Sequence, residues 1–269
     1  MHVTISYKVG MRLLVIGGTG YLGREVCRVA SAAGWEVVQA GHASGHGIAV
    51  DVCDPAAVEH LVDDVAPTAV LNLAYVQEGP RAWEVNVDGA RNVARAAATQ
   101  GCRLLHLSTD VVFDGRLGRP YVETDAPSPC TDYGRSKAEA ERAVAAQAPA
   151  ALVVRTSLIV GGPGCEPSRH ELAALDDTLT FYDDEVRCPV QVTDLAHALL
   201  ELAALDVAGP LHVAGPEALS RAELAELIRG APVPRAPAPP DRPLDCSLDS
   251  SSARALLRAT LRGAHRVFG

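Results

Sequence analysis

The feature that most restricts the fold is a short apolar segment, Arg12–Ile16, followed at once by the glycine-rich run GGTGYLG at 17–23. Apolar residues then recur at helical spacing from Leu22 onward, which indicates a strand, a tight turn and a helix in that order. The glycines fit G-x-x-G-x-x-G and, counted from Gly18, G-x-G-x-x-G. Because glycine lets the backbone approach closely, amide groups and the helix N-terminus can bind the two phosphates of a dinucleotide. The alternative is a glycine-rich turn without a ligand, which the strand and helix on either side disfavour.

The same alternation continues through the first 160 residues. Further strand candidates, separated by stretches long enough for crossover helices, are Trp35–Ala40, Ala69–Leu73, Arg103–Ser108 and Ala151–Thr156. This pattern predicts an α/β fold of the Rossmann type, a doubly wound parallel sheet with helices on both faces. After about Gly161 glycines, prolines and shorter elements take over, with helices predicted at Asp194–Leu205 and Arg221–Arg229. We therefore expect a dinucleotide-binding Rossmann domain over residues 11–160, a smaller C-terminal substrate lobe over 161–269 with exchange of elements allowed, and an N-terminal extension over 1–10.

Composition excludes several classes of partner. The 269 residues carry a formal net charge of -9 without a marked run of Lys and Arg, which makes nucleic acid an improbable ligand. No apolar run reaches the roughly 18 residues that span a bilayer, and the N-terminus lacks a secretory pattern, so we expect a cytoplasmic protein without membrane contact. The seven cysteines include no Cys-x-x-Cys pair and the nine histidines no close ligand pairs. The sequence therefore predicts neither disulfides nor a metal site.

The end of the second strand bears on the choice of cofactor. An acid there would bind the adenosine ribose hydroxyls and repel a 2′-phosphate, but the chain has Gly41, His42 and, two residues on, Ser44. This favours NADP(H), while NAD(H) stays open because no arginine follows. His42 can equally be an ordinary exposed loop histidine. Asp51 and Val52 end the next short strand and are expected to flank the adenine, with the carboxylate accepting from its amino group.

Tyr133 and Lys137 are the candidate reactive residues. Four residues apart in an Ala- and Glu-rich helical stretch, they share one helical face, and Ser128 is a plausible N-cap for that helix. A free tyrosine has a pKa of about 10, and a nearby ammonium favours its phenolate, as a proton donor to a developing alkoxide requires. Such a pair is more often a solvated helix face. Here it follows a strand that ends in Ser108 and Thr109, at the edge where open α/β sheets bind ligands, and Thr109 can donate to a substrate carbonyl.

Three segments together resemble the extended short-chain dehydrogenase/reductases, and within them the dTDP-4-dehydrorhamnose reductase subgroup. They are GGTGYLG, STDVVFDG at 108–115 and YGRSKAEAE at 133–141. Supporting segments, which extend the resemblance over almost the whole chain, are LNLAY at 71–75, VNVDGARNVARAA at 85–97, RCPVQVTDLAHAL at 187–199 and LHVAG at 211–215. The family's Asn-Ala-Ala is Asn-Leu-Ala in this chain.

The resemblance implies specific roles. It makes Thr109, Tyr133 and Lys137 the catalytic set. The implied cofactor-binding residues are Gly17, Thr19, Gly20, Tyr21, Leu22, His42, Asp51, Val52, Leu73, Ala74, Tyr75, Ser108, Tyr133 and Lys137, and the implied substrate contacts are Thr109, Val111 and Arg187. Related dehydratases follow their threonine with an Asp-Glu pair, whereas this chain has Asp110 and Val111, which disfavours elimination.

The function implied is an NAD(P)H-dependent reductase of a nucleotide-linked 4-keto-6-deoxysugar, and a homodimer is compatible with the resemblance. Two alternatives remain. A smaller carbonyl substrate is suggested because the stretch between Gly161 and Glu185 carries few cations, with Arg169 and then Arg187 as the obvious partners for a diphosphate. A non-catalytic dinucleotide-binding regulatory subunit is the other, because the same subfamily resembles the regulatory subunit of methionine adenosyltransferase.

Overall fold

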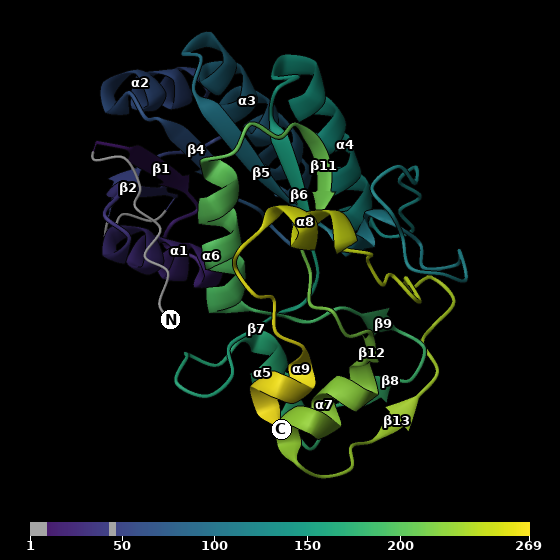
Figure 1. The fold of residues 1–269 in the computed structure, drawn as a ribbon. Helices are drawn as coiled ribbons and strands as arrows, with labels where there is room; N and C mark the ends of the chain where they lie inside the picture. The colour runs from purple at the N-terminus through teal and green to yellow at the C-terminus, as the bar shows by residue number, and fades with distance from the viewer. Residues whose placement is uncertain (1–9, 43–46) are drawn as a thin grey trace. The chain divides into compact units, whose positions relative to one another are not determined.

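The computed structural model describes residues 10–42 and 47–269. Ser44 and all of the predicted N-terminal extension except Gly10 therefore lie outside the described residues. The helices, shown with the strands in Figure 1, are α1 (Tyr21–Ala32), α2 (Pro55–Val65), the π-helix η1 (Glu84–Gly89), α3 (Ala90–Thr99), the 3₁₀ turn η2 (Asp110–Val112), α4 (Asp132–Gln147), α5 (Arg169–Ala174), α6 (Val192–Ala203), α7 (Arg221–Arg229), α8 (Ser251–Leu256) and α9 (Ala264–Phe268).

The principal sheet has seven parallel strands in the order β11-β6-β5-β4-β1-β2-β3. They are β1 (Arg12–Ile16), β2 (Glu36–Gly41), β3 (Ile48–Ala49), β4 (Ala69–Asn72), β5 (Arg103–Thr109), β6 (Leu152–Thr156) and β11 (Gly209–His212). β1 pairs with β2 on one side and with β4 on the other, so the direction of winding reverses between β1 and β4. In doubly wound sheets ligands bind outside the carboxyl ends of the strands at this reversal. The predicted fold class is confirmed.

The predicted elements agree closely with the observed ones. Arg12–Ile16 and Arg221–Arg229 have the predicted bounds. The other predicted strands differ by one residue at one end, except Trp35–Ala40, which is shifted by one residue at both ends. The helix predicted at Asp194–Leu205 begins and ends two residues earlier, as α6. β2 continues through Gly41, which places that glycine at the carboxyl end of the strand.

The chain divides into two compact units, each described by itself. The first unit contains the described residues up to Leu107 together with Glu139–Val153 and Leu199–Gly209, and the second contains Ser108–Ala138, Val154–Ala198 and Pro210–Gly269. The predicted boundary between residues 160 and 161 stays a prediction.

The first unit has a core between the sheet and one layer of helices. Leu14 and Ile16 of β1 point to the same face of the sheet, because side chains alternate along a strand. They pack with apolar residues of α2 and α3 and with the C-terminal half of α4, while α1 contributes nothing to this cluster. Figure 1 shows α1 on the opposite side of β1 and β2 from α2 and α3. Covering both faces explains why all but one of the β1 residues are fully buried.

The second unit contains three two-stranded sheets and, among its described residues, three small clusters of buried apolar side chains. The strand pairs are β7 (Ile159–Val160) with β10 (Val190–Gln191), β9 (Val186–Arg187) with β12 (Leu219–Ser220), and β8 (Phe181–Tyr182) with β13 (Arg235–Ala236). In one core the Phe113 and Tyr121 rings stack with centroids 3.9 Å apart. Beside it, the guanidinium of Arg155 lies 5.1 Å from the Phe113 centroid, a cation–π contact that partly offsets burial of the charge.

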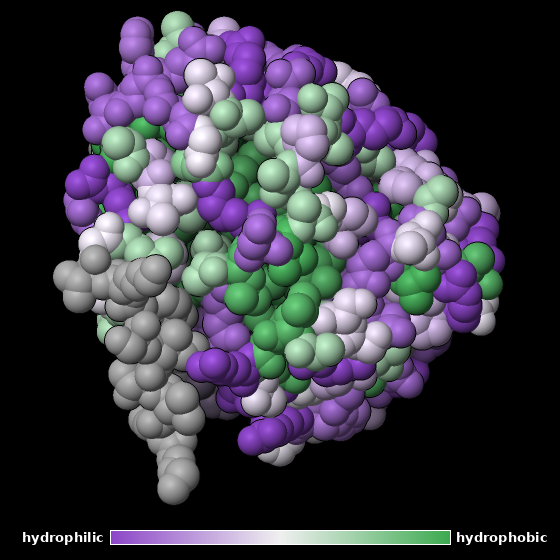
Figure 2. Space-filling view, turned by 45° about the horizontal axis from the view of Figure 1, so that its top comes forward, coloured by the Kyte–Doolittle hydropathy of each residue, from purple (hydrophilic) through white to green (hydrophobic). Residues whose placement is uncertain are grey.

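The surface agrees with the composition. Figure 2 shows hydrophilic residues over most of the face that it draws. None of the helices within residues 10–42 and 47–269 is long and apolar enough to cross a membrane.

Candidate functional site

The glycine loop joins β1 to α1, and at two of its positions the surrounding backbone leaves no room for a Cβ atom. Gly17 has φ +82°, and a Cβ there would lie 2.8 Å from the backbone of Leu73 and Ala74. A Cβ on Gly23 would lie 2.3 Å from the Gly17 carbonyl oxygen. Larger residues at either position would separate the loop from β4 or from α1, so these glycines fix the turn.

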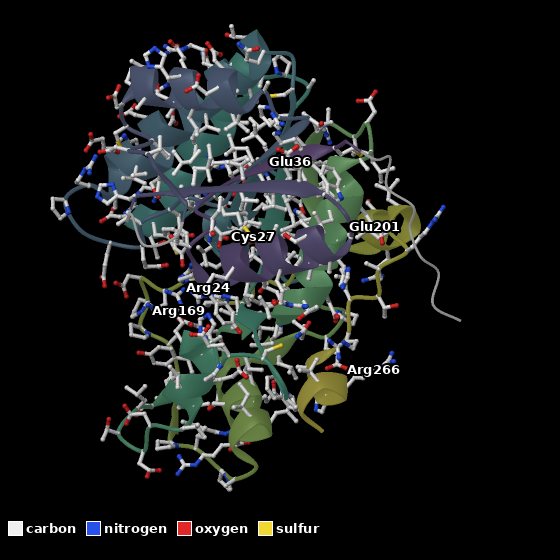
Figure 3. The ribbon with its side chains drawn as sticks, turned by 90° about the vertical axis from the view of Figure 1, so that its left-hand side faces the viewer. Arg24, Cys27, Glu36, Arg169, Glu201 and Arg266 are labelled. Atoms are coloured by element: carbon white, nitrogen blue, oxygen red, sulfur yellow. The ribbon has the colours of Figure 1, made fainter. Side chains whose placement is uncertain are left out.

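Gly20 differs, because the protein leaves room beside it. It is the N-cap of α1, and a Cβ there would meet a single atom, the Gly17 carbonyl oxygen at 3.3 Å. The open space next to Gly20 belongs to a pocket, and the first turn of α1 carries no acid. Arg24, on α1 in Figure 3, donates to the Thr19 carbonyl at 2.8 Å and so braces the loop. A positive helix end facing open space is the arrangement that binds phosphate.

The pocket beside Gly20, in the first unit, has a volume of about 360 Å³ and lies at the carboxyl ends of β1, β2 and β4. Nine predicted cofactor residues line it: Gly17, Thr19, Gly20, His42, Asp51, Val52, Leu73, Ala74 and Tyr75. Tyr21 and Leu22 stand in the first turn of α1 and are not among its lining residues. Their part in binding, through backbone amides, stays a prediction.

β2 ends at Gly41, which has no side chain, and His42 follows it in the lining of this pocket. Gly41 lines it, and a Cβ there would lie 3.0 Å from Thr19 Oγ1. The Gln39 amide donates to the Gly18 carbonyl at 2.6 Å, which ties β2 to the glycine loop. An adenosine ribose next to Gly41 would meet no carboxylate from β2, so the residues fit either dinucleotide and do not repel a 2′-phosphate.

Asp51 is paired with an arginine that the sequence analysis did not identify. Arg81 lines the same pocket, and its Nη2 lies 2.8 Å from Asp51 Oδ2. Asp51 Oδ1 also accepts from the Cys53 amide at 3.0 Å. These two hydrogen bonds hold the pKa of Asp51 below its ordinary value, so the carboxylate stays ionised and can accept further hydrogen bonds.

Three residues of the segment 85–97, Asn86, Gly89 and Asn92, contact the backbone or side chains of Val52 and Val76, which line the pocket. The buried Asn86 amide exchanges hydrogen bonds with the backbone of Val76, and Asn92 donates to the Val52 carbonyl at 3.0 Å. A Cβ on Gly89 would lie 2.5 Å from Val52. Their spacing of three residues places all three on one helical face, which is the sequence signal that could have identified them. They fix the loops that carry Asp51 and Tyr75.

Thr109 belongs to the second unit and begins the turn η2. Its hydroxyl accepts from the Val111 amide at 3.3 Å and donates to Asp110 Oδ1 at 3.1 Å. Because a hydroxyl has one hydrogen, donation to a substrate carbonyl requires this hydrogen to turn away from Asp110. The buried Asp110 carboxylate also accepts from Ser157 at 2.5 Å and lies 3.7 Å from Arg187 Nε. Burial raises the pKa of Asp110, and Arg187 acts in the opposite direction.

The start of α4 lies directly against η2. A Cβ on Gly134 would lie 2.2 Å from the Val111 carbonyl oxygen, so this contact needs glycine. The neighbour of Gly134 is Tyr133, which is half-buried, and one turn later stands Lys137, which is buried. The fold thus brings Thr109 and Tyr133, 24 positions apart in the sequence, onto adjoining turns. The catalytic roles of Thr109, Tyr133 and Lys137 stay predictions.

The predicted N-cap of this helix was wrong. α4 begins at Asp132, and the Thr131 hydroxyl accepts from the Gly134 amide at 3.1 Å, as an N-cap does. Ser128 lies further upstream and accepts instead from the Asp114 amide at 3.4 Å. Thr131 is the N-cap because an N-cap residue directly precedes the first helical residue, Asp132. Ser128 lies four positions before Asp132.

Arg187 is buried among backbone carbonyls. It donates to the carbonyls of Val186, Leu244 and Pro243 and lies 4.0 Å from Glu185, in addition to its contact with Asp110. Its predicted contact with a substrate, like those of Thr109 and Val111, stays a prediction.

The second unit gathers more cations than the sequence suggested. Arg221, far along the chain from residues 161–185, lies near Glu185 and near Arg169, Arg187 and Arg242; we call these four arginines the arginine cluster. Arg242 Nε contacts Glu185 at 2.5 Å. Burial lowers the pKa of Arg221 to about 10, and the other three arginines oppose the effect of Glu185. A group of four guanidiniums close to one another is suited to an anion such as a diphosphate.

His170 is held neutral inside this cluster. Its Nδ1 lies 3.2 Å from Arg221 Nη1, and Arg169 Nε lies 3.5 Å from its Nε2. Burial, and then the charges of Arg221 and Arg169, lower the pKa of His170 to about 3. No group of three or more His, Cys, Asp or Glu side chains able to hold a metal ion occurs within the described part of the chain.

Comparison with known proteins identifies the family. The family model described as RmlD substrate binding domain matches residues 11–262. The dTDP-4-dehydrorhamnose reductase of Mycobacterium tuberculosis (strain ATCC 25618 / H37Rv) is 37% identical over 223 residues, which cover 78% of this chain and 72% of that protein. Methionine adenosyltransferase 2 subunit beta of Rattus norvegicus is 31% identical over 274 residues, covering 88% of this chain and 80% of the relative.

A solved structure agrees in fold. The dTDP-4-dehydrorhamnose reductase of Bacillus anthracis, in complex with NADP, has a TM-score of 0.83 at 22% identity and covers 98% of this chain and 99% of its own. The resemblance drawn from the glycine loop and the Tyr133 segment is confirmed. The chain belongs to the RmlD substrate binding domain family, among the extended short-chain dehydrogenase/reductases.

Proposed function

We propose that this chain is an NAD(P)H-dependent reductase of a nucleotide-linked 4-keto-6-deoxysugar, with NADPH as the favoured cofactor. The observation that carries the proposal is the contact of Gly134 with Val111, which sets the Thr109 hydroxyl and Tyr133 on adjoining turns with Lys137 one turn further along α4. The pocket beside Gly20 fits a dinucleotide, and the Bacillus anthracis relative binds NADP.

The chemistry assigns one role to each residue. A reduced nicotinamide, when bound, supplies the hydride to the carbonyl carbon. The Tyr133 hydroxyl gives its proton to the carbonyl oxygen, and the resulting phenolate takes a proton back from solvent. Lys137 stabilises that phenolate because its ammonium lies on the same helical face. Thr109 orients the carbonyl oxygen once its hydroxyl hydrogen turns from Asp110 toward the substrate.

The arginine cluster supports a nucleotide-linked substrate over a smaller carbonyl compound. A free keto sugar gives four guanidiniums no anion to bind, whereas a diphosphate accepts several charge-assisted hydrogen bonds at once. Arg221 and Arg242 retain partial exposure and can reach a ligand. We therefore expect Arg242→Gln to raise KM for the nucleotide sugar and to leave turnover at saturation nearly unchanged.

The test is NADPH oxidation with dTDP-4-dehydrorhamnose and related nucleotide-linked keto sugars, each compared with its free sugar. Tyr133→Phe should lower kcat by about 10²-fold or more while the Kd for NADPH stays the same. Absence of turnover with every one of these substrates would reject the sugar assignment. Equal turnover of free and nucleotide-linked sugar would favour the smaller substrate.

A regulatory subunit is the second candidate, favoured by the similarity to methionine adenosyltransferase 2 subunit beta over 88% of the chain. In that case the chain binds a dinucleotide and a partner enzyme, and Tyr133 has no chemical task. Normal function of the Tyr133→Phe variant, together with a co-purifying enzyme whose rate depends on this chain, is the result that would select it.

A further inference from the structure

His170 lies between two guanidinium groups of the arginine cluster. Its Nδ1 lies 3.2 Å from Arg221 Nη1, and its Nε2 lies 3.5 Å from Arg169 Nε. Arg169, labelled in Figure 3, shares α5 with His170, whereas Arg221 begins α7. The imidazole ring therefore joins two helices that pack against each other.

The two contacts of the ring cannot both be hydrogen bonds. A guanidinium only donates, and a neutral imidazole has one acceptor nitrogen and one N–H group. The shorter contact makes Nδ1 the acceptor from Arg221, so the ring hydrogen is on Nε2 and faces the Nε hydrogen of Arg169. Within residues 10–42 and 47–269 no acceptor lies within hydrogen-bond distance of His170 Nε2. An acceptor oxygen beside Nε2 would satisfy this hydrogen.

The charges that act on the ring are both positive. They are those of Arg221 and Arg169, and together with burial they lower the pKa of His170 to about 3. Glu171, the next residue on α5, directs its carboxylate to three backbone amides. Glu185 acts on Arg221 and not on His170. The ring is thus neutral because no acid within the described part of the chain offsets the two guanidiniums.

A bound diphosphate would supply the missing negative charge. Its charges would offset those of the guanidiniums, because charges a few ångströms apart interact strongly in a partly buried site. Its oxygens would also accept from Arg221, which leaves His170 Nδ1 able to bind a proton. Both effects raise the pKa of His170 toward its ordinary value of 6.5. Arg169 is exposed and His170 only partly buried, so an anion can reach them from solvent.

We propose that binding of a nucleotide-linked sugar to the arginine cluster is coupled to the uptake of a proton by His170. Nε2 of the ring donates to a phosphate oxygen, and a proton from solvent binds Nδ1. The imidazolium then adds its positive charge to those of the four arginines, so the protein holds the ligand more tightly as pH falls. This inference rests on the proposed nucleotide-sugar substrate and adds control by pH to its binding.

Isothermal titration with dTDP-glucose tests the coupling. This probe carries the diphosphate but no keto group, so it is not reduced, and its phosphates stay ionised throughout the pH range used. The binding enthalpy in two buffers of different ionisation enthalpy gives the number of protons taken up. The wild type should take up about 0.3 protons or more per ligand at pH 6 and almost none at pH 8. Its Kd should fall about threefold or more between pH 7.5 and pH 5.5.

His170→Gln is compared with His197→Gln. A glutamine at position 170 keeps an acceptor oxygen for Arg221 and an NH2 donor for the ligand, but it does not titrate. It should abolish both the proton uptake and the fall of Kd with pH. His197, an exposed residue of α6 in the same unit, is the matched control, and its variant should behave like the wild type.

The outcomes separate the two proposals. Binding of dTDP-glucose without proton uptake, or uptake that persists in His170→Gln, overturns the inference and leaves the reductase proposal intact. A protein that binds no dTDP-linked sugar, while it oxidises NADPH with a free keto sugar, overturns both the inference and the nucleotide-sugar assignment.

Discussion

Gly134→Ala tests whether the contact between η2 and α4 builds the site. The added Cβ would lie 2.2 Å from the Val111 carbonyl oxygen, so the two turns must separate by about 1 Å to reach an ordinary contact distance. Overpacking of this kind typically costs about 1–3 kcal/mol of stability. Because Thr109 caps η2 and Tyr133 adjoins Gly134, the same shift changes the distance between their hydroxyls. A misplacement near 1 Å lowers turnover about 10²-fold.

The matched control is Gly118→Ala, in the same unit. Gly118 has φ +76° with no neighbour within 4 Å of the added Cβ, so alanine there costs about 1 kcal/mol of backbone strain and moves nothing. Urea unfolding gives the stability of both variants, and NADPH oxidation with dTDP-4-dehydrorhamnose gives their kcat. The reasoning is refuted if Gly134→Ala keeps wild-type stability, or if its kcat equals that of Gly118→Ala.

Three further predictions concern the second unit. The Glu171 carboxylate accepts hydrogen bonds from three backbone amides at 2.7–2.9 Å. Glu171→Gln turns an NH2 donor toward at least one of these amides, so it should lower the free energy of unfolding, measured in urea, by about 2 kcal/mol. The pKa of His170 is lowered to about 3, so between pH 6.5 and 3 the unfolded chain binds a proton that the folded chain does not, and stability falls as pH falls. His170→Gln should make the free energy of unfolding depend less on pH, by up to about 1.4 kcal/mol per pH unit, as measured by urea unfolding at pH 7, 6 and 5. An equal pH dependence in the wild type and the variant would contradict the lowered pKa of His170. Asp110→Asn leaves the buried Arg187 without its nearest carboxylate and should destabilise the protein by about 3 kcal/mol; a loss below 1 kcal/mol would show that backbone carbonyls suffice for Arg187.

Local patterns made the Rossmann elements and the glycine loop predictable. Arg12–Ile16, the glycines and α1 are consecutive in the chain, so the order of apolar and glycine residues specifies them without long-range information. The same holds for the adjoining positions of Thr109 and Tyr133, since a strand end and the next helix start lie at one edge of a doubly wound sheet. Ser128 was misassigned because several residues before α4 could cap it, and only the backbone path selects Thr131.

The residues that escaped prediction make contacts between distant parts of the chain. Arg81 reaches Asp51 across 30 positions, and Arg242 reaches Glu185 across 57. Nothing near Arg242 in the sequence distinguishes it from an arginine in a solvated, proline-rich stretch. Its proximity to Arg221 comes from how β9, β12 and the following segments pack, which propensity and periodicity do not encode. Groups of charged side chains assembled in this way cannot be predicted before the fold is known.

The surroundings of Asp110 bear on the choice between reduction and elimination. Loss of water from a sugar requires an acid and a base that both reach the substrate. Val111 removes one of the two acids that related dehydratases carry at this position. The other acid, Asp110, is buried, and its two oxygens are engaged by Thr109, Ser157 and Arg187. Releasing Asp110 would break the Ser157 hydrogen bond and take from the buried Arg187 its nearest carboxylate, a cost that a solvated acid would not carry. In the mechanism that we propose, Tyr133 is the proton donor that remains, and a single donor is sufficient for reduction.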